Sequence, residues 1–225
     1  MHKIESLINE NIDKFNTYMR FLQEKNKVMN LTNIVEDREI FEKHFFDSLY
    51  LLEVEEIKSN TKLIDIGTGA GFPGVPLAIV REDLEFTLID ARNKRVEFLK
   101  ELINLLGLKN VEVFHVRSEE LAHNRNFREK YDYALSRAVT NLRDLMEYSA
   151  PFLKIGGKVI SYKSIKSSQE LEESKSAIKT LNLELEKLIN YKLFDYDRSL
   201  VIIKKNKKTD SIYPRSNAQM KKKPL

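Results

Sequence analysis

The sequence predicts an α/β protein with a doubly wound, mostly parallel sheet and a helical extension at the N-terminus. Two observations lead to this prediction. From residue 62 onward, short apolar runs alternate with amphipathic helical periods, and a glycine-rich turn directly follows the first run. Such alternation is typical of a parallel sheet covered by helices on both faces. At 225 residues, the chain is long enough for one such domain but not for two.

Five runs rich in Ile, Val, Leu and aromatic residues are strand candidates, and a sixth comes late in the chain. The clearest helix covers 93–106, because its apolar residues share one face and Gly107 follows at the C-cap position. A later helix is expected at 169–181. The predicted strands are 62–66, 85–90, 111–116, 131–136, 158–162 and 199–204.

The first 60 residues have a different pattern. Apolar residues recur at three- and four-residue steps from Ile4 to Leu22, which predicts an amphipathic helix. After a loop at 30–33, a second helix is expected from about Asp37, which would act as its N-cap. We therefore divide the chain into a helical extension at 1–60 packed on the core, a ligand-binding domain at 61–205 and a basic tail at 206–225.

The composition limits the possible chemistry. Hydrophobic residues make up 42% and charged residues 32% of the chain, as in a globular protein. The chain has no cysteine, which excludes disulfides, thiolate zinc sites and a cysteine nucleophile. Its four histidines lack the spacing of metal ligands, so we expect no metal. No stretch approaches the roughly 20 apolar residues of a membrane span, so we expect a cytoplasmic protein with no membrane partner.

The turn Asp65-Ile66-Gly67-Thr68-Gly69-Ala70-Gly71 follows the first strand. Alternate glycines let the backbone turn sharply and approach a ligand at the carboxyl edge of the sheet. Gly69, Gly71 and Gly74 also satisfy the dinucleotide fingerprint, but two prolines crowd the turn where a pyrophosphate needs free amides. An acidic residue followed by G-x-G-x-G resembles motif I of class I methyltransferases. Asp90 could hold a ribose of either ligand, so the pattern favours S-adenosylmethionine but leaves NAD or FAD open.

Several longer motifs resemble one family, the bacterial 16S ribosomal RNA guanine-N7 methyltransferases, also called glucose-inhibited division protein B. The glycine turn continues as Phe72-Pro73-Gly74-Val75-Pro76-Leu77, as in that family. The resemblance extends over almost the whole chain in one order. It also rests on Asn30-Leu31-Thr32, His44-Phe45-Phe46-Asp47-Ser48-Leu49, Ser136-Arg137-Ala138, Tyr213-Pro214-Arg215 and Lys222-Lys223-Pro224-Leu225. Ser216-Asn217-Ala218-Gln219-Met220 replaces the glycine-bearing run that many members carry before the last motif.

The resemblance implies a methyltransferase that moves a methyl group from S-adenosyl-L-methionine to N7 of one guanine in 16S ribosomal RNA. It implies that Gly67 and Phe72 line the cofactor site, together with Gly69, Gly71 and Asp90 of the motifs above. Ser118 and Glu119 would hold the adenine edge through backbone amides. Arg137 would lie between cofactor and substrate, where its guanidinium could hold the methionine carboxylate, a phosphate or guanine O6.

No general base is required, because guanine N7 already exposes a lone pair. Arg137 and Lys163 are therefore positioning candidates rather than certain catalytic groups. Phe72, Arg137 and Tyr162 lie near the strand ends and could stack a base, although core packing is the favoured role of Tyr162. His44 and Asp47 share one helix face, and a structural hydrogen bond that docks the extension is favoured over an acid/base pair.

The C-terminal end is strongly basic. From Lys204 to Leu225 there are eight basic residues and one acidic residue, a pattern expected of a segment that meets RNA phosphate or of a solvated tail. Arg215, Lys222 and Lys223 are therefore substrate-binding candidates alongside Arg137 and Lys163. The expected partner is 16S ribosomal RNA or the small ribosomal subunit, bound by a monomer. A methyltransferase of another substrate, a non-catalytic RNA-binding module and a Rossmann dehydrogenase are the alternatives.

Overall fold

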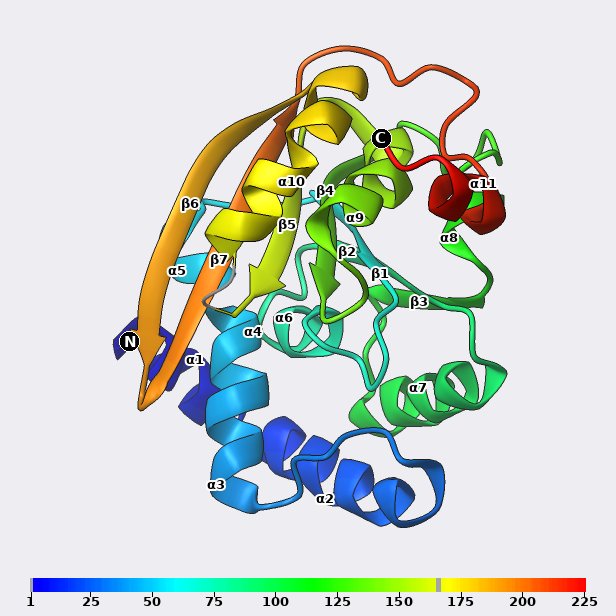
Figure 1. Ribbon diagram of the computed structural model, residues 1–225. Helices are drawn as coiled ribbons and strands as arrows, with labels where there is room; N and C mark the ends of the chain where they lie inside the picture. The colour runs from blue at the N-terminus through cyan, green and yellow to red at the C-terminus, as the bar shows by residue number, and fades with distance from the viewer. Residues whose placement is uncertain (1, 165–166) are drawn as a thin grey trace.

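A computed structural model describes residues 2–164 and 167–225 and contains one seven-stranded sheet (Figure 1). The strand order is β3-β2-β1-β4-β5-β7-β6. All pairs from β3 to β5 are parallel, whereas β7 runs antiparallel to both of its neighbours. The strands are β1 Lys62–Ile66, β2 Glu85–Asp90, β3 Val111–His115, β4 Tyr131–Arg137, β5 Leu153–Lys163, β6 Leu183–Leu193 and β7 Tyr196–Lys205. This arrangement confirms the predicted mostly parallel sheet.

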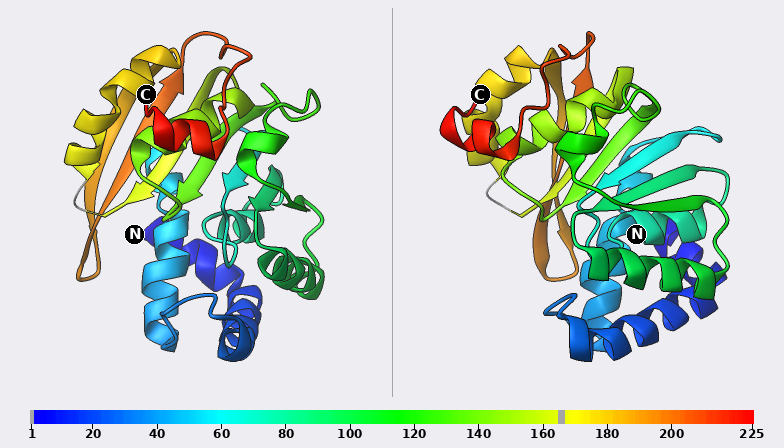
Figure 2. Two further views of the ribbon diagram at one scale, coloured as in Figure 1. Left: turned by 45° about the vertical axis from the view of Figure 1, so that its right-hand side comes forward. Right: turned by 90° about the vertical axis from the view of Figure 1, so that its right-hand side faces the viewer.

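Helices cover both faces of the sheet, and each face has its own apolar core (Figure 2). Because side chains alternate along a strand, neighbouring Leu63 and Ile64 of β1 belong to different cores. On one face lie α1 His2–Glu10, α2 Ile12–Met29, α3 Asp37–Ile40, η1 Phe41–Phe46, α4 Asp47–Leu49, α5 Leu51–Val54, α6 Gly74–Val80 and α7 Asn93–Leu106. On the other lie α8 Ser118–Leu121, α9 Leu142–Ser149, η2 Ala150–Phe152 and α10 Ser167–Thr180.

The N-terminal extension differs from the prediction in two respects. The expected first helix is broken at Asn11, whose side-chain amide donates to the Leu7 carbonyl at 3.0 Å, so α1 and α2 are separate helices. The prediction that Asp37 is an N-cap was wrong. Glu36 occupies that position without a capping bond, and the Asp37 carboxylate instead accepts from Gln23 Nε2 at 2.7 Å. The widened π-helical turn η1 within this second helical segment was not expected either.

The edge strand β6 was missed. Among the strands that the structure describes, it pairs only with β7, and most of its side chains are exposed or half-buried. Charged side chains are frequent along such edges because they discourage pairing with other chains. The segment therefore lacks the apolar run that revealed the central strands. The turn between β6 and β7 forms the tip of the long hairpin in Figure 1.

The C-terminal segment folds back onto the body of the protein and is not a free tail. Arg128 donates to the carbonyl oxygens of Thr209, Asp210 and Tyr213, at 2.8–3.1 Å. A capping box formed by Ser216 and Gln219 then starts a final helix, α11 Asn217–Lys222. Figure 1 places α11 beside α8 and α9. No helix within the described parts of the chain has the length and apolar character to cross a membrane.

Candidate active site at the carboxyl ends of the parallel strands

The strand order reverses direction between β1 and β4, and the glycine turn lies at the carboxyl edge of the sheet at that point. Open α/β sheets bind ligands in this crevice. Gly67, Gly69 and Gly71 all have positive φ, between 63° and 101°, a region that other residues adopt only with strain. The turn is attached to β2 because the Gly69 N–H donates to Asp90 Oδ2 at 3.0 Å. The structure therefore brings these four predicted residues together.

The three glycines are required for different reasons. A Cβ on Gly71 would lie 2.7 Å from Tyr18 Oη and 2.8 Å from Val75 Cγ2, so this position is closed by core packing. A Cβ on Gly67 would meet the side chain of Val139, which follows β4, at 2.7 Å. At Gly69 the nearest atom is Arg95 Nη1 at 3.8 Å. Of the three glycines, only Gly69 therefore has open space in the direction of its missing side chain.

Two carboxylates, Asp65 and Asp90, accept hydrogen bonds from the glycine turn and the residues that follow it. Asp90 accepts from the Arg92 N–H at 2.8 Å and from Arg95 Nη1 at 3.3 Å in addition to Gly69. Asp65 is buried and accepts the Thr68 hydroxyl and the Gly74 N–H through Oδ2. Burial raises the pKa of Asp65 to about 7 against the opposing effect of these two hydrogen bonds. Among the described residues its Oδ1 has no hydrogen-bond partner, although it is buried.

Phe72 and Tyr162 do not present a face to solvent. Phe72 is 5% exposed and stacks on the Tyr18 and His44 rings, with centroids 5.3 and 4.3 Å away. Tyr162 is 3% exposed and donates its hydroxyl to the Ser48 carbonyl at 2.8 Å. The hypothesis that either ring stacks a base was therefore wrong for this conformation, whereas core packing of Tyr162 is confirmed. Contact of Phe72 with a cofactor stays a prediction.

Arg137 is held by the N-terminal extension. It ends β4, and its guanidinium lies 4.8 Å from the Phe72 ring centre. Nη1 donates to the Lys43 carbonyl at 3.0 Å and to Asp47 Oδ2 at 3.2 Å. Nη2 lies 2.9 Å from His44 Nδ1. The predicted structural role of His44 and Asp47 is therefore confirmed, and η1 is the element that brings the Lys43 carbonyl and His44 to Arg137.

The contact with Arg137 fixes the tautomer of His44. A guanidinium can only donate, so Nδ1 must accept and the ring proton must lie on Nε2. Nε2 is 3.0 Å from Thr32 Oγ1, which therefore accepts this proton. Burial, reinforced by the positive charge of Arg137, lowers the pKa of His44 to about 3. The imidazole is neutral and links the loop before α3 to the end of β4.

Three other predicted site residues follow or end neighbouring strands of the sheet. Ser118 and Glu119 form the first turn of α8, after β3, and the Ser118 hydroxyl donates to the Tyr148 carbonyl at 3.2 Å. Lys163 ends β5 and donates to the Thr140 carbonyl at 2.9 Å and Glu170 Oε2 at 2.7 Å. A cavity of about 620 Å³ extends from Arg137 to Lys163 and Glu170.

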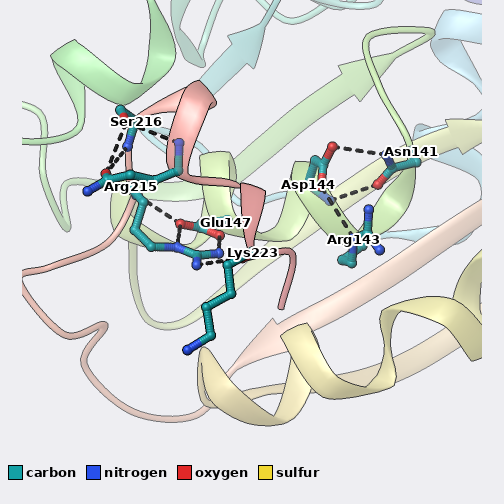
Figure 3. A network of polar contacts seen from close by, with 8 residues as sticks. Asn141, Arg143, Asp144, Glu147, Arg215, Ser216 and Lys223 are labelled. Atoms are coloured by element: carbon teal, nitrogen blue, oxygen red, sulfur yellow. Dashed lines mark hydrogen bonds and ion pairs between the residues drawn. The ribbon is translucent and has the colours of Figure 1, made fainter. Parts of the chain in front are cut away.

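Arg215 and the terminal lysines are away from this cavity. Figure 3 shows Arg215 against Glu147 of α9, with Nε to Oε1 at 2.8 Å and Nη2 to Oε2 at 2.7 Å. Its Nη1 also donates to the Lys223 carbonyl at 2.8 Å. The side chains of Lys222 and Lys223 are exposed at the end of α11. The structure thus gives Arg215 a bracing contact, and its binding to RNA stays a prediction.

Sequence comparison identifies the family. The model of the rRNA small subunit methyltransferase G family matches residues 11–201, which include the extension from α2 onward, the glycine turn and Arg137. The chain belongs to this family. A relative from Clostridium perfringens (strain 13 / Type A), named "Ribosomal RNA small subunit methyltransferase G", is 44% identical over 214 residues. The match covers 94% of this chain and 90% of that protein.

Other comparisons agree with this family. A second relative of the same name, from Lachnoclostridium phytofermentans, is 46% identical over 95% of this chain and 89% of its own length. A SAM-dependent methyltransferase from Aquifex aeolicus has a TM-score of 0.57 at 18% identity, over 75% of this chain and 94% of that one. TYW2 from M. jannaschii, solved with AdoMet, has a TM-score of 0.59 at 16% identity, over 77% and 79%. These structures confirm the class I methyltransferase fold of this family member.

Four residues around the centre were not found from the sequence as site residues. Thr32 appeared only as part of a motif, and Tyr191, Arg198 and Glu170 not at all. Tyr191 donates to Asp47 Oδ1 at 2.8 Å, and Arg198 Nε lies 3.7 Å from the same oxygen. Tyr191 belongs to β6, which was missed, and Glu170 to a helix identified by its apolar face alone. The sequence carries no local signal that would place them here.

Proposed function

We propose that this protein transfers a methyl group from S-adenosyl-L-methionine to N7 of a single guanine in 16S ribosomal RNA. The observation that carries the proposal is the family match over residues 11–201, which includes both the glycine turn and Arg137. The fold adds support, because one solved structure with a similar fold is a SAM-dependent methyltransferase and another was solved with AdoMet. The glycine turn alone left NAD and FAD open, and family membership removes the reason to prefer them.

The residues at the glycine turn fit this cofactor. The turn leaves open space above Gly69, and Asp90 offers carboxylate oxygens that can accept from ribose hydroxyls. Asp65 Oδ1 is a buried acceptor without a partner among the described residues, as expected beside a site that receives a polar group. Gly67, Gly71, Phe72, Ser118, Glu119 and Arg137 complete the proposed cofactor-binding set. When bound, S-adenosylmethionine supplies a methyl group activated by its positive sulfur.

The protein has to position the base and exclude water rather than remove a proton. Guanine N7 carries an accessible lone pair, so a catalytic base is unnecessary, and holding the two reactants in line supplies the acceleration. Arg137 is rigid, because its guanidinium contacts Lys43, His44 and Asp47. Lys163 reaches the cavity from the adjacent strand end. We assign both residues positioning roles next to the reacting atoms.

The partner is ribosomal RNA, in accord with the names of the relatives. The finer parts of the proposal are that the RNA is 16S, presented in the small subunit, and that a cytoplasmic monomer binds it. The exposed side chains of Lys222 and Lys223 extend from α11, which packs beside α9. They can contact phosphates several residues away from the methylated base, and Arg215 holds the segment in place.

Methyl transfer to isolated subunits tests the proposal directly. Small ribosomal subunits from a strain that lacks the enzyme are incubated with the protein and tritiated S-adenosylmethionine, and the labelled nucleoside is mapped after nuclease digestion. We expect label in one N7-methylguanosine of 16S RNA. Cofactor binding without label in any ribosomal RNA would contradict the proposal and favour a methyltransferase of another substrate or a non-catalytic binding module.

A further inference from the structure

The cavity between the ends of β4 and β5 contains an ion pair between Lys163 and Glu170, and the proposed reaction gives no role to Glu170. It is lined by Arg137, Thr140, Lys163 and Glu170 among others and has a volume of about 620 Å³, enough for a purine base. Thr140 precedes α9, and Glu170 lies on α10, so two helices and two strand ends meet here. The hydrogen bonds inside the cavity determine which groups remain for a ligand.

Arg137 is held firmly in place. The Lys43 carbonyl, Asp47 and His44 use three of the five N–H donors of its guanidinium, and its plane lies against Phe72. Removing these contacts would take the Arg137 donor from two buried side chains, Asp47 and His44. Arg137 is therefore suited to form a fixed wall of the cavity.

Lys163 retains one donor. An ammonium group has three hydrogens. Two of them are directed at the Thr140 carbonyl, 2.9 Å away, and at Glu170 Oε2, 2.7 Å away. The Lys163 side chain is mostly buried at the cavity wall, so these bonds hold the ammonium in one place. Its third hydrogen can be given to a ligand oxygen.

Glu170 retains one acceptor oxygen. Its Oε2 accepts from Lys163 and also from the Leu142 N–H, at 2.8 Å, at the first turn of α9. Within residues 2–164 and 167–225, no group donates to Oε1. The carboxylate is thus fixed through one oxygen, while the other can accept hydrogen bonds from a ligand.

We propose that Lys163 and Glu170 read the Watson–Crick edge of the target guanine in this cavity. Guanine presents the O6 acceptor beside the N1–H and N2–H donors. The spare hydrogen of Lys163 matches O6, and Glu170 Oε1 matches N1–H and N2–H. Adenine presents a donor at position 6 and an acceptor at N1, which reverses this order. The inference rests on the proposed function, and it names Glu170 as the residue that distinguishes guanine from the other bases.

The same pairing favours the reaction. As the N7 lone pair forms its bond to the methyl carbon, the sulfur–methyl bond breaks with its electron pair left on sulfur, and the guanine ring becomes positively charged. Positive charge on the ring makes N1–H a stronger donor. A carboxylate facing N1–H therefore binds the transition state more strongly than the substrate.

A change of one enzyme group combined with a change of one base group tests the pairing. Glu170→Gln must keep its amide oxygen towards Leu142 and Lys163, so its NH₂ would face the guanine donors. The substrates are small subunits reconstituted from ligated 16S RNA with guanine or inosine at the methylated position, because inosine lacks only the N2 amino group. Wild-type kcat/KM should favour guanine by about 10- to 100-fold, the contribution of one hydrogen bond to a charged group.

In Glu170→Gln, we expect kcat/KM to fall on both bases, because both present N1–H, and to fall further on guanine, so that the guanine-to-inosine ratio approaches one. Affinity for S-adenosylmethionine and the melting temperature should remain at wild-type values. Glu172→Gln is the matched control, because Glu172 lies on the same helix but is exposed and outside the cavity. It should leave the ratio unchanged.

Failure of this inference and failure of the proposed function give different results. If wild type methylates guanine and Glu170→Gln lowers the rate on guanine and inosine equally, Glu170 has a structural role and the inference is overturned. It is also overturned if wild type does not discriminate between the two bases. If wild type methylates no subunit, the proposed function itself falls and this inference falls with it.

Discussion

Arg215 and Glu147 lie 68 positions apart and form a two-pronged ion pair, with Nε and Nη2 directed at the two carboxylate oxygens. Glu147 is only 2% exposed, and it also accepts the Arg215 N–H at 2.8 Å. A charge at this depth is stable only with its partner in place. The pair therefore fixes the C-terminal segment to α9, the helix whose first turn anchors Glu170 (Figure 3).

Breaking this pair should destabilise the fold. Arg215→Met leaves a buried carboxylate without a charged partner, with only the backbone N–H of residue 215 donating to it among the described residues, and we expect the free energy of unfolding to fall by about 3 kcal/mol. Adding Glu147→Met should restore part of the loss, because two apolar side chains bury no charge. Urea unfolding of both single variants and the double variant measures the coupling. Strictly additive effects would show that the pair contributes nothing beyond its separate residues.

Alanine substitutions at two positive-φ glycines distinguish the effect of backbone strain from the effect on ligand binding. Gly69→Ala and Gly107→Ala place alanine at φ of +63° and +66°, so each should lose about 1 kcal/mol of stability. Nothing lies within 4 Å of a Cβ at Gly107, which ends α7. Only Gly69→Ala should also weaken S-adenosylmethionine binding, measured by calorimetry. Equal cofactor affinity in the two variants would remove Gly69 from the site.

His44 makes stability depend on pH with a definite sign. Burial lowers its pKa from 6.5 to about 3 in the folded protein, so the unfolded chain binds more protons between these values. The contribution of His44 to the free energy of unfolding is fully present above pH 6.5. It is lost as the pH falls from 6.5 to about 3, by up to about 1.4 kcal/mol per pH unit. Asp65 acts in the opposite direction, because its pKa is raised from 3.8 to about 7.

A His44 variant isolates this contribution. In His44→Asn the side-chain oxygen can replace Nδ1 as the acceptor for Arg137, but it does not titrate. Chemical unfolding of wild type and variant is measured from pH 4 to pH 6.5, where the His44 imidazole binds a proton in the unfolded chain but not in the folded protein. The variant should lose less stability as the pH falls. The Asp65 contribution is common to both proteins and cancels. Parallel pH profiles would show that His44 is not held neutral.

The terminal lysines should affect RNA binding without affecting the cofactor. Replacing Lys221, Lys222 and Lys223 by Gln removes three exposed charges but keeps the packed segment. We expect weaker RNA binding and a smaller salt dependence, by about 0.9 in slope for each lost phosphate contact. The control replaces Lys58, Lys109 and Lys130, three exposed lysines that precede β1, β3 and β4 at the amino edge of the sheet. Equal salt slopes in both triple variants would contradict this role.

The central elements could be predicted because their signals are local. The strands at 62–66 and 85–90 and the helix at 93–106 have the predicted bounds, since apolar periodicity and glycine punctuation determine them within a few residues. The π-helical turn and β6 could not be predicted in this way. The first depends on distant packing, and the second is an edge strand whose exposed charges interrupt the apolar pattern.

The site was predictable in its parts but not in its connections. The motifs named Gly69, Asp90 and Arg137, and helical spacing placed His44 and Asp47 on one face. Nothing local shows that the guanidinium of Arg137 reaches a helix 90 positions earlier. The contact of Lys163 with Glu170 depends on how α10 packs, which the sequence pattern of α10 does not specify.

The N-terminal extension supplies the acceptors of Arg137, and this constrains how the protein can change over time. Thr32, His44 and Asp47 form one hydrogen-bonded unit with a residue at the end of β4. A substitution at any of them leaves a buried donor or acceptor without a partner unless another changes with it. We therefore expect substitutions at these positions to occur together. An N-terminal extension taken from a distant methyltransferase of the same fold should pack poorly on this sheet, because it would lack the acceptors that Arg137 requires.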